Sequence, residues 1–219
     1  MQRIKKMLQS SADTEYENVH QLFLHDRADE AEQEAQKLIK KYPTHTSTYF
    51  LLAQIAWNDR HYQRAREWYN KILSYEKNNS KALLWRARAH FECYRFENAL
   101  NDYLTLYEQS FQKIDYLVSL GDCYQKLNLH DIALRYYLKA VDLDPKSIKA
   151  YLWIGYEYII DGHYAQASHA VTKAKELYYA NKYEYDTGVV DNIFDLEKHV
   201  KMVTGEKDSS KSKKKVRKK

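Results

Sequence analysis

The sequence predicts an all-α protein that is assembled from a repeated pair of helices. Only 2 Pro and 5 Gly occur in 219 residues, which is too few for the many turns of an all-β fold. Hydrophobic residues make up 44% of the chain and charged residues 30%, as in a protein with a packed core. The decisive observation is a repeat, because alanine recurs every 34 residues at Ala31, Ala65, Ala99, Ala133 and Ala167.

Two further columns of mostly apolar residues keep the same register. One stands four residues after each alanine and the other seven residues after, which is the spacing of one helix face. The columns are Ala35, Tyr69, Tyr103, Tyr137 and Val171, and Leu38, Ile72, Leu106, Ala140 and Ala174. A pair of helices cannot bury such a face alone, so neighbouring pairs are expected to stack. Small residues such as Gly121 and Gly155 are expected where the helices cross closely.

One copy of the repeat resembles a known motif. It reads Leu117-Val-Ser-Leu-Gly-Asp-Cys-Tyr124 and continues with Ala133, Tyr137, Ala140 and Pro145. The pattern is similar to the tetratricopeptide repeat, with Leu117 in place of the usual tryptophan. The resemblance implies a right-handed superhelical α-solenoid of five helix-turn-helix repeats, at 12–45, 46–79, 80–113, 114–147 and 148–181.

The two ends of the chain differ from the repeats. Residues 1–11 form a short N-terminal segment, and the first repeat carries the polar Glu15 and Asn18 at positions that are apolar in the other copies, as suits the end of a solenoid. Apolar residues from Val189 to Val203 follow helical spacing, which predicts a capping helix within 182–204. Residues 205–219 are expected to form a disordered basic tail.

The positive charge of the chain is concentrated in this tail. The whole sequence carries a net charge of +5, whereas residues 205–219 hold eight basic and two acidic residues. The repeats are therefore close to neutral, and the overall basicity does not indicate that they bind nucleic acid. The tail itself could make weak contacts with polyanions, direct targeting or only solubilise the chain.

Nothing in the sequence favours an enzyme, a cofactor or a bound metal. No P-loop, dinucleotide-binding, zinc-protease or serine-hydrolase motif is found. His61 and His163 recur in equivalent turns and are interpreted as polar turn residues. Cys93 and Cys123 are expected inside helices as reduced packing residues, which with no signal-peptide pattern and no membrane-spanning run predicts a cytoplasmic protein.

The resemblance also implies where a partner would bind. In tetratricopeptide-repeat proteins the first helix of each repeat lines a concave groove, which takes a peptide or protein segment. The residues predicted to form that groove are Phe50, Gln54, Trp57, Lys81, Leu84, Trp85, Arg88, Phe91, Gln125, Lys149, Trp153 and Tyr156. Val118 and Leu152 occupy further positions that are expected to be exposed there.

Two subfamilies can be compared through their residues. Co-chaperones that hold the acidic ends of heat-shock chaperones need a set of Lys, Asn and Arg, of which only Lys81 is present. Residues 150–200 resemble the end of type III secretion chaperones, although those have fewer repeats. We therefore predict a non-catalytic adaptor that binds an apolar peptide segment. The alternatives are a dedicated chaperone of one partner and a nucleic-acid- or ribosome-associated protein that acts through the tail.

Overall fold

The computed structural model describes residues 2–109, 114–180 and 187–205, and these residues form eleven helices and no strand. The chain divides into two compact units, Met1–Ser110 and Phe111–Lys219. The all-α prediction is confirmed. The tail and the first residues of the 182–204 segment lie outside the described residues.

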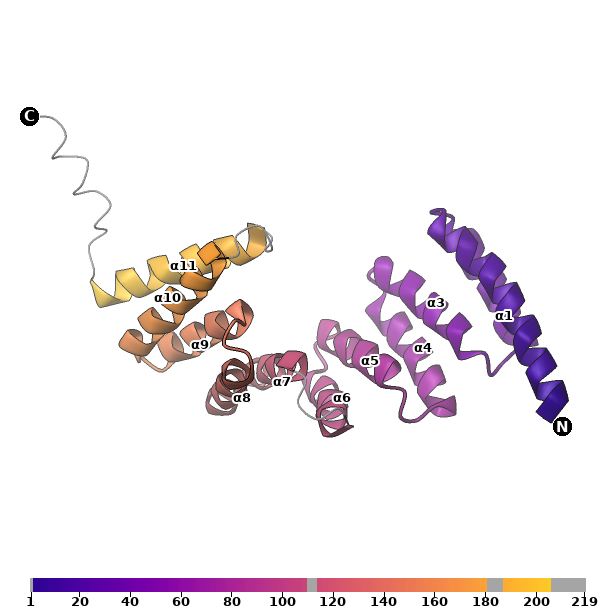
Figure 1. Ribbon diagram of the computed structural model, residues 1–219, viewed down its shortest axis with the longest axis horizontal. Helices are drawn as coiled ribbons and strands as arrows, with labels where there is room; N and C mark the ends of the chain where they lie inside the picture. The colour runs from indigo at the N-terminus through magenta and orange to yellow at the C-terminus, as the bar shows by residue number, and fades with distance from the viewer. Residues whose placement is uncertain (1, 110–113, 181–186, 206–219) are drawn as a thin grey trace, which may run out of the picture. The chain divides into compact units, whose positions relative to one another are not determined.

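The first unit holds six helices that follow one another as three antiparallel pairs (Figure 1). Their bounds are α1 Gln2–Leu24, α2 Ala28–Lys41, α3 Thr46–Asn58, α4 Tyr62–Tyr75, α5 Ser80–Glu92 and α6 Phe96–Gln109. Helix α1 begins at Gln2, so it includes most of the residues that were assigned to a short N-terminal segment. Cys93 was expected inside a helix but follows the last residue of α5.

The second unit holds two pairs and one further helix. Their bounds are α7 Ile114–Lys126, α8 His130–Leu143, α9 Ile148–Ile160, α10 Tyr164–Ala180 and α11 Thr187–Thr204. Helix α11 packs on both α9 and α10 (Figure 1). It buries Ile193, Leu196 and Val200 against a cluster that includes Leu152 and Val171. The prediction of a C-terminal capping helix is confirmed.

The five turns inside the helical pairs share one backbone geometry. Each contains a residue in the left-handed region, and these residues are again 34 apart: Asp26, Arg60, Tyr94, Asn128 and Gly162, with φ between 58° and 73°. Beside each of them an amide closes the preceding helix, as His61 N donates to the Ala56 carbonyl at 2.8 Å. Only the last turn uses glycine. Asp26 and Asn128 are of residue types that tolerate this conformation, whereas Arg60 and Tyr94 adopt it at a cost.

The alanine column lies in the packed interior of the helical pairs. All five alanines are fully buried, and Tyr69, Tyr103 and Tyr137 of the neighbouring column are buried as well. Gly121 has the tightest environment, because an added Cβ would collide with the Tyr137 ring. A Cβ on Gly155 would come within 2.9 Å of Leu196 on the capping helix. Small residues are therefore needed where these helices meet.

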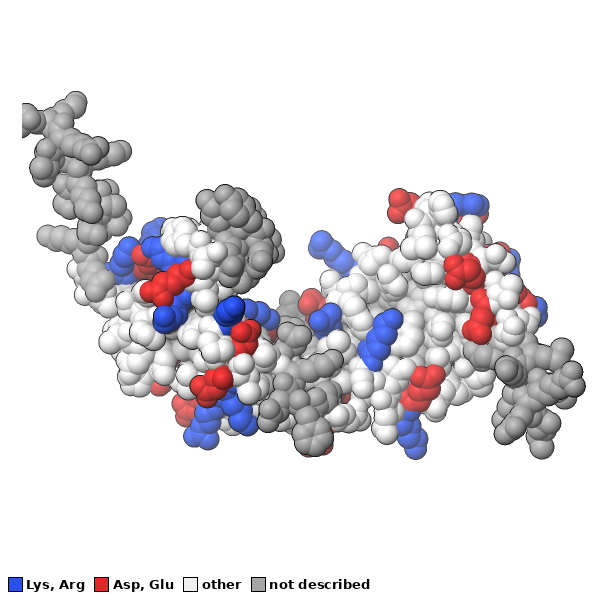
Figure 2. Space-filling view, in the orientation of Figure 1, with Lys and Arg blue, Asp and Glu red and all other residues white. Residues whose placement is uncertain are grey.

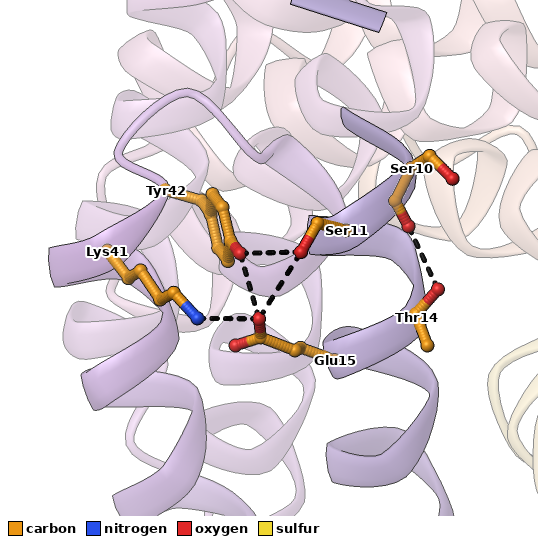
Figure 3. A network of polar contacts seen from close by, with 6 residues as sticks. All are labelled: Ser10, Ser11, Thr14, Glu15, Lys41 and Tyr42. Atoms are coloured by element: carbon orange, nitrogen blue, oxygen red, sulfur yellow. Dashed lines mark hydrogen bonds and ion pairs between the residues drawn. The ribbon is translucent and has the colours of Figure 1, made fainter. Parts of the chain in front are cut away.

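Polar contacts join α1 to the end of α2, its partner in the first pair. Glu15 accepts hydrogen bonds from Lys41 at 2.6 Å and from Tyr42 at 2.8 Å, and Ser11 lies 2.9 Å from the Tyr42 hydroxyl (Figure 3). The bonds from Lys41 and Tyr42 lower the pKa of the Glu15 carboxyl. The polar residue that makes the first repeat atypical thus has partners on α2 and the residue that follows it.

Candidate functional site

In the first unit, α3 and α5 are each the first helix of a repeat, and each carries three of the predicted groove residues at the same spacing. Phe50, Gln54 and Trp57 stand four and seven residues along α3. Lys81, Trp85 and Arg88 stand four and seven residues along α5. Because side chains at this spacing share one side of a helix, each helix presents a row of three.

Five of these six residues line a hollow between α3, α4 and α5. Its volume is about 390 Å³, and its lining residues are Phe50, Gln54, Trp57, Asn58, Tyr69, Lys81 and Trp85. We call it the aromatic pocket. A concave site with mostly aromatic walls and a few polar groups is typical of a site that binds a ligand side chain.

Ring contacts hold the walls of the aromatic pocket in place. The Trp57 and Trp85 rings meet edge to face, with their centroids 5.2 Å apart. Phe50 packs on Tyr69 at 6.1 Å, and Trp57 also touches Tyr62 at 4.9 Å. Such contacts stabilise aromatic pairs beyond the burial of their area, so the pocket is largely preformed. Burial raises the pKa of the Tyr69 phenol.

The charge beside the pocket is entirely positive. Lys81 Nζ lies 4.9 Å from the Phe50 ring centre, and the Arg88 guanidinium carbon lies 4.8 Å from that of Trp85. Both side chains are exposed, and within the described part of the chain neither forms an ion pair. No carboxylate is among the lining residues. The cations remain available to an acidic or carbonyl group of a ligand.

Leu84 and Phe91 lie apart from the aromatic pocket. Both are half-buried, and the Phe91 ring packs against Phe96 at the start of α6, with centroids 5.2 Å apart. Tyr69, in contrast, was assigned only to the buried column, although its ring also forms a wall of the pocket. A residue in a repeating column can both pack in the core and form a wall of a pocket. Its spacing in the sequence shows only that it packs in the core.

The predicted groove residues of the second unit are mostly engaged with their own neighbours. Gln125 donates a hydrogen bond to Glu157 at 2.7 Å, and Lys149 forms an ion pair with Asp122 at 2.9 Å. Trp153 stacks on Tyr137 and touches Tyr156, with ring centroids 6.3 and 5.6 Å apart. These four side chains do not line the aromatic pocket.

The expected exposure is wrong at two positions in this unit. Val118 and Leu152 are buried, at 5% and 6% exposed. Leu152 belongs to the cluster formed with α10 and the capping helix α11, so the cap removes from solvent a position that the repeat pattern placed in the groove. Helical spacing alone does not reveal that covering.

A buried carboxylate was also missed by the sequence analysis. Glu157 is only 2% exposed, and its second oxygen lies 2.8 Å from His130 Nδ1. A buried polar side chain with a partner on each oxygen is a structural feature of the unit. His130 therefore has a packing role, and among the described residues no group of three potential ligands could hold a metal ion.

The Cys123 thiol is not a reactive group. Cys123 is buried, and burial raises the pKa of its thiol to about 12, so it stays protonated.

Over the face shown in Figure 2, basic and acidic side chains are scattered among uncharged residues in each unit. No described helix is long and apolar enough to cross a membrane.

Comparison with known families identifies the repeat. A tetratricopeptide-repeat model matches residues 114–147, and a second tetratricopeptide-repeat model matches residues 22–80. Residues 22–80 and 114–147 therefore carry tetratricopeptide repeats. Proteins of this family are generally non-catalytic scaffolds that bind other proteins. No curated protein sequence gives a significant match to the chain.

Solved structures show the same fold. MamA from Desulfovibrio magneticus RS-1 is 19% identical with a TM-score of 0.72, and the match covers 78% of this chain and 96% of that one. PilF from Pseudomonas aeruginosa is 14% identical with a TM-score of 0.63, covering 91% and 95%. A tetratricopeptide-repeat protein from Parabacteroides merdae is 20% identical with a TM-score of 0.69, covering 90% and 88%. At these identities the similarity supports the fold alone.

Proposed function

We propose that the chain is an adaptor that binds an apolar peptide segment of a partner protein in the aromatic pocket of its first unit. The observation that carries the proposal is the preformed hollow of about 390 Å³ with its aromatic walls. Large aromatic residues and arginine contribute most of the binding energy at protein interfaces. The amides of Gln54 and Asn58 would hydrogen-bond the peptide backbone, and Lys81 would favour an acidic neighbour of the apolar side chain.

A substitution that fills the aromatic pocket tests the proposal and removes no packed side chain. Gln54 is exposed and lines the pocket, so Gln54→Trp would occupy the hollow from the solvent side. Gln63 on α4 is also exposed but does not line the pocket, and Gln63→Trp is the matched control. The full chain is used to select binders from a random displayed-peptide library, and both variants are then measured against the selected peptides.

The selected peptides should share an aromatic or large aliphatic residue. Gln54→Trp should weaken their binding by about thirtyfold or more, which corresponds to the loss of one anchor contact of about 2 kcal/mol. Gln63→Trp should leave the affinity unchanged. Equal affinities for the two variants, with both proteins folded by circular dichroism, would place peptide binding elsewhere.

The charge of residues 206–219 favours a second activity, which is a weak contact with polyanions. This segment lies outside the described residues, and the argument rests on its sequence alone. Removal of residues 206–219 should abolish any salt-sensitive binding to RNA while peptide binding is retained. RNA binding that survives this truncation would have to be assigned to the near-neutral helical units.

A further inference from the structure

The aromatic pocket has a cation near each end of one wall. Lys81 and Arg88 both project from α5, with Trp85 between them in the sequence. Lys81 Nζ lies 4.9 Å from the ring centre of Phe50, which is in the first half of α3, and Trp85 meets Trp57 near the end of α3. The guanidinium carbon of Arg88 lies 4.8 Å from the Trp85 ring centre. One positive charge therefore flanks the Phe50 end of the pocket, and a second flanks the Trp57 end.

A second observation places Arg88 beside the pocket. Burial raises the pKa of the Tyr69 phenol, and the positive charge of Arg88 opposes that rise. Tyr69 is one of the residues that line the hollow. The charge of Arg88 therefore acts at the pocket wall, although its side chain is not itself part of the lining.

Both cations are accessible to a ligand. Lys81 and Arg88 are exposed, and over the ranges that the structure describes neither forms an ion pair. A ring face attracts a cation and restricts its motion without cancelling its charge. No carboxylate lines the hollow. The two charges can therefore bind carboxylates that a ligand brings with it.

The lysine-rich end of the chain is not a suitable ligand for this site. Residues 206–219 hold eight basic and two acidic residues, and none of them is aromatic. Like charges would repel this segment from Lys81 and Arg88, and it has no ring to fill the hollow. The charge and shape of the site fit an acidic segment of another protein.

We infer that the aromatic pocket takes an extended peptide in which one aromatic residue has an acidic residue two positions before it and another two positions after it. This inference rests on the proposed function and specifies the partner. Residues two apart in an extended chain point to the same side, so both carboxylates would face the protein together with the aromatic anchor.

The spacing of the two cations matches this pattern. Lys81 and Arg88 are seven residues apart, which is about 10.5 Å along the helix. The two acidic residues of the peptide would be four positions apart, which is about 13 Å in an extended chain. The long, flexible side chains of lysine and arginine can cover the difference of about 3 Å.

Calorimetric titration of the full chain with three synthetic peptides tests the pattern. All are acetylated and amidated. The first is Gly-Asp-Ser-Phe-Ser-Asp-Gly, the second has Asn in place of both Asp, and the third is Gly-Ser-Asp-Phe-Asp-Ser-Gly, which moves the acids next to the anchor. The first peptide should bind at least about fivefold more tightly than either of the others, as two exposed ion pairs would provide. This preference should shrink in about 1 M salt, where the Debye length is about 3 Å.

Charge reversal on the protein tests the same contacts from the other side. Lys81→Glu and Arg88→Glu, made separately, should each weaken binding of the first peptide by about fivefold or more and leave the Asn peptide within about twofold. Lys71→Glu is the matched control, because Lys71 is exposed on α4 and does not line the pocket. It should bind all three peptides like the wild type, and circular dichroism checks that every variant is folded.

Equal affinity of the wild-type chain for the Asp and Asn peptides, or for the two placements of the acids, would overturn the inference. So would a Lys81→Glu or Arg88→Glu variant that binds the first peptide no more weakly than Lys71→Glu does. If the Asp and Asn peptides bind equally and Gln54→Trp weakens both, only the acidic pattern fails and the aromatic pocket remains the peptide site. If no peptide binds, or Gln54→Trp leaves binding unchanged, the proposed function fails as well.

Discussion

Gly121 should tolerate no side chain, because it lies against the buried Tyr137 ring. An ideal Cβ at Gly121 would collide with that ring, and two further ring atoms would be 2.7 Å away. The ring has little room to move, since it is fully buried and its hydroxyl donates a hydrogen bond to Asp122 at 2.9 Å. We therefore expect Gly121→Ala to force the ring out of position.

The expected magnitude follows from three contributions. Overpacking costs about 1–3 kcal/mol, and loss of the bond to Asp122 costs about 1 kcal/mol. Replacing a helical glycine by alanine returns about 1 kcal/mol of helix propensity. Gly121→Ala should thus lower the free energy of unfolding by about 1–3 kcal/mol, and each kcal/mol lowers Tm by about 4–8 °C in a unit of this size.

A double-mutant cycle isolates the collision from other effects. Tyr137→Leu removes the ring, so in that background Gly121→Ala should be neutral or stabilising through its helix propensity. Urea unfolding followed by circular dichroism gives the free energies for all four proteins. The same destabilisation by Gly121→Ala in both backgrounds would refute the explanation, because the ring would then not be the cause.

Three further predictions concern the cap, the half-buried His90 and a turn. Truncation after Ala180 should expose the face covered by α11 and lower the stability of the second unit, whereas truncation after Gly205 should not; thermal unfolding of both proteins checks this. Since burial lowers the folded pKa of His90 to about 4, below its usual 6.5, protonation favours the unfolded chain. The contribution of neutral His90 to the free energy of unfolding is complete above about pH 6.5 and is lost as the pH falls toward 4. His90→Gln should therefore reduce the acid sensitivity of the urea midpoint. Gly162→Ala should cost about 1 kcal/mol, although nothing lies within 4 Å of an added Cβ, because φ is +73°; an unchanged urea midpoint would contradict this.

The repeat itself could be predicted from the sequence because packing enforces it. Ala133 and its equivalents must be small at each crossing, and this requirement leaves a visible period of 34 residues. The shared turn geometry was less visible. Left-handed turns favour glycine, asparagine and aspartate, as at Gly162, Asn128 and Asp26, but Arg60 and Tyr94 adopt the same conformation, so residue type did not reveal that all five turns are alike.

The candidate site was only partly predictable for a different reason. Helical spacing shows which residues share a side of one helix, and it grouped Phe50, Gln54 and Trp57 as the structure does. It does not show which side chains a neighbouring helix will pair or cover. Lys149 pairs with Asp122, and Leu152 is buried with the capping helix, and both contacts depend on three-dimensional packing.

The measurement that tests the central claim most directly is the NMR response of the tryptophan indoles to a selected peptide. The chain has 4 Trp, and Trp57 and Trp85 meet in the aromatic pocket, whereas Trp153 lies in the second unit against Tyr137. Addition of a peptide with an apolar anchor should shift the Trp57 and Trp85 indole signals and leave that of Trp153 unchanged. Saturable binding with unmoved Trp57 and Trp85 signals would contradict the assignment of the aromatic pocket as the peptide site.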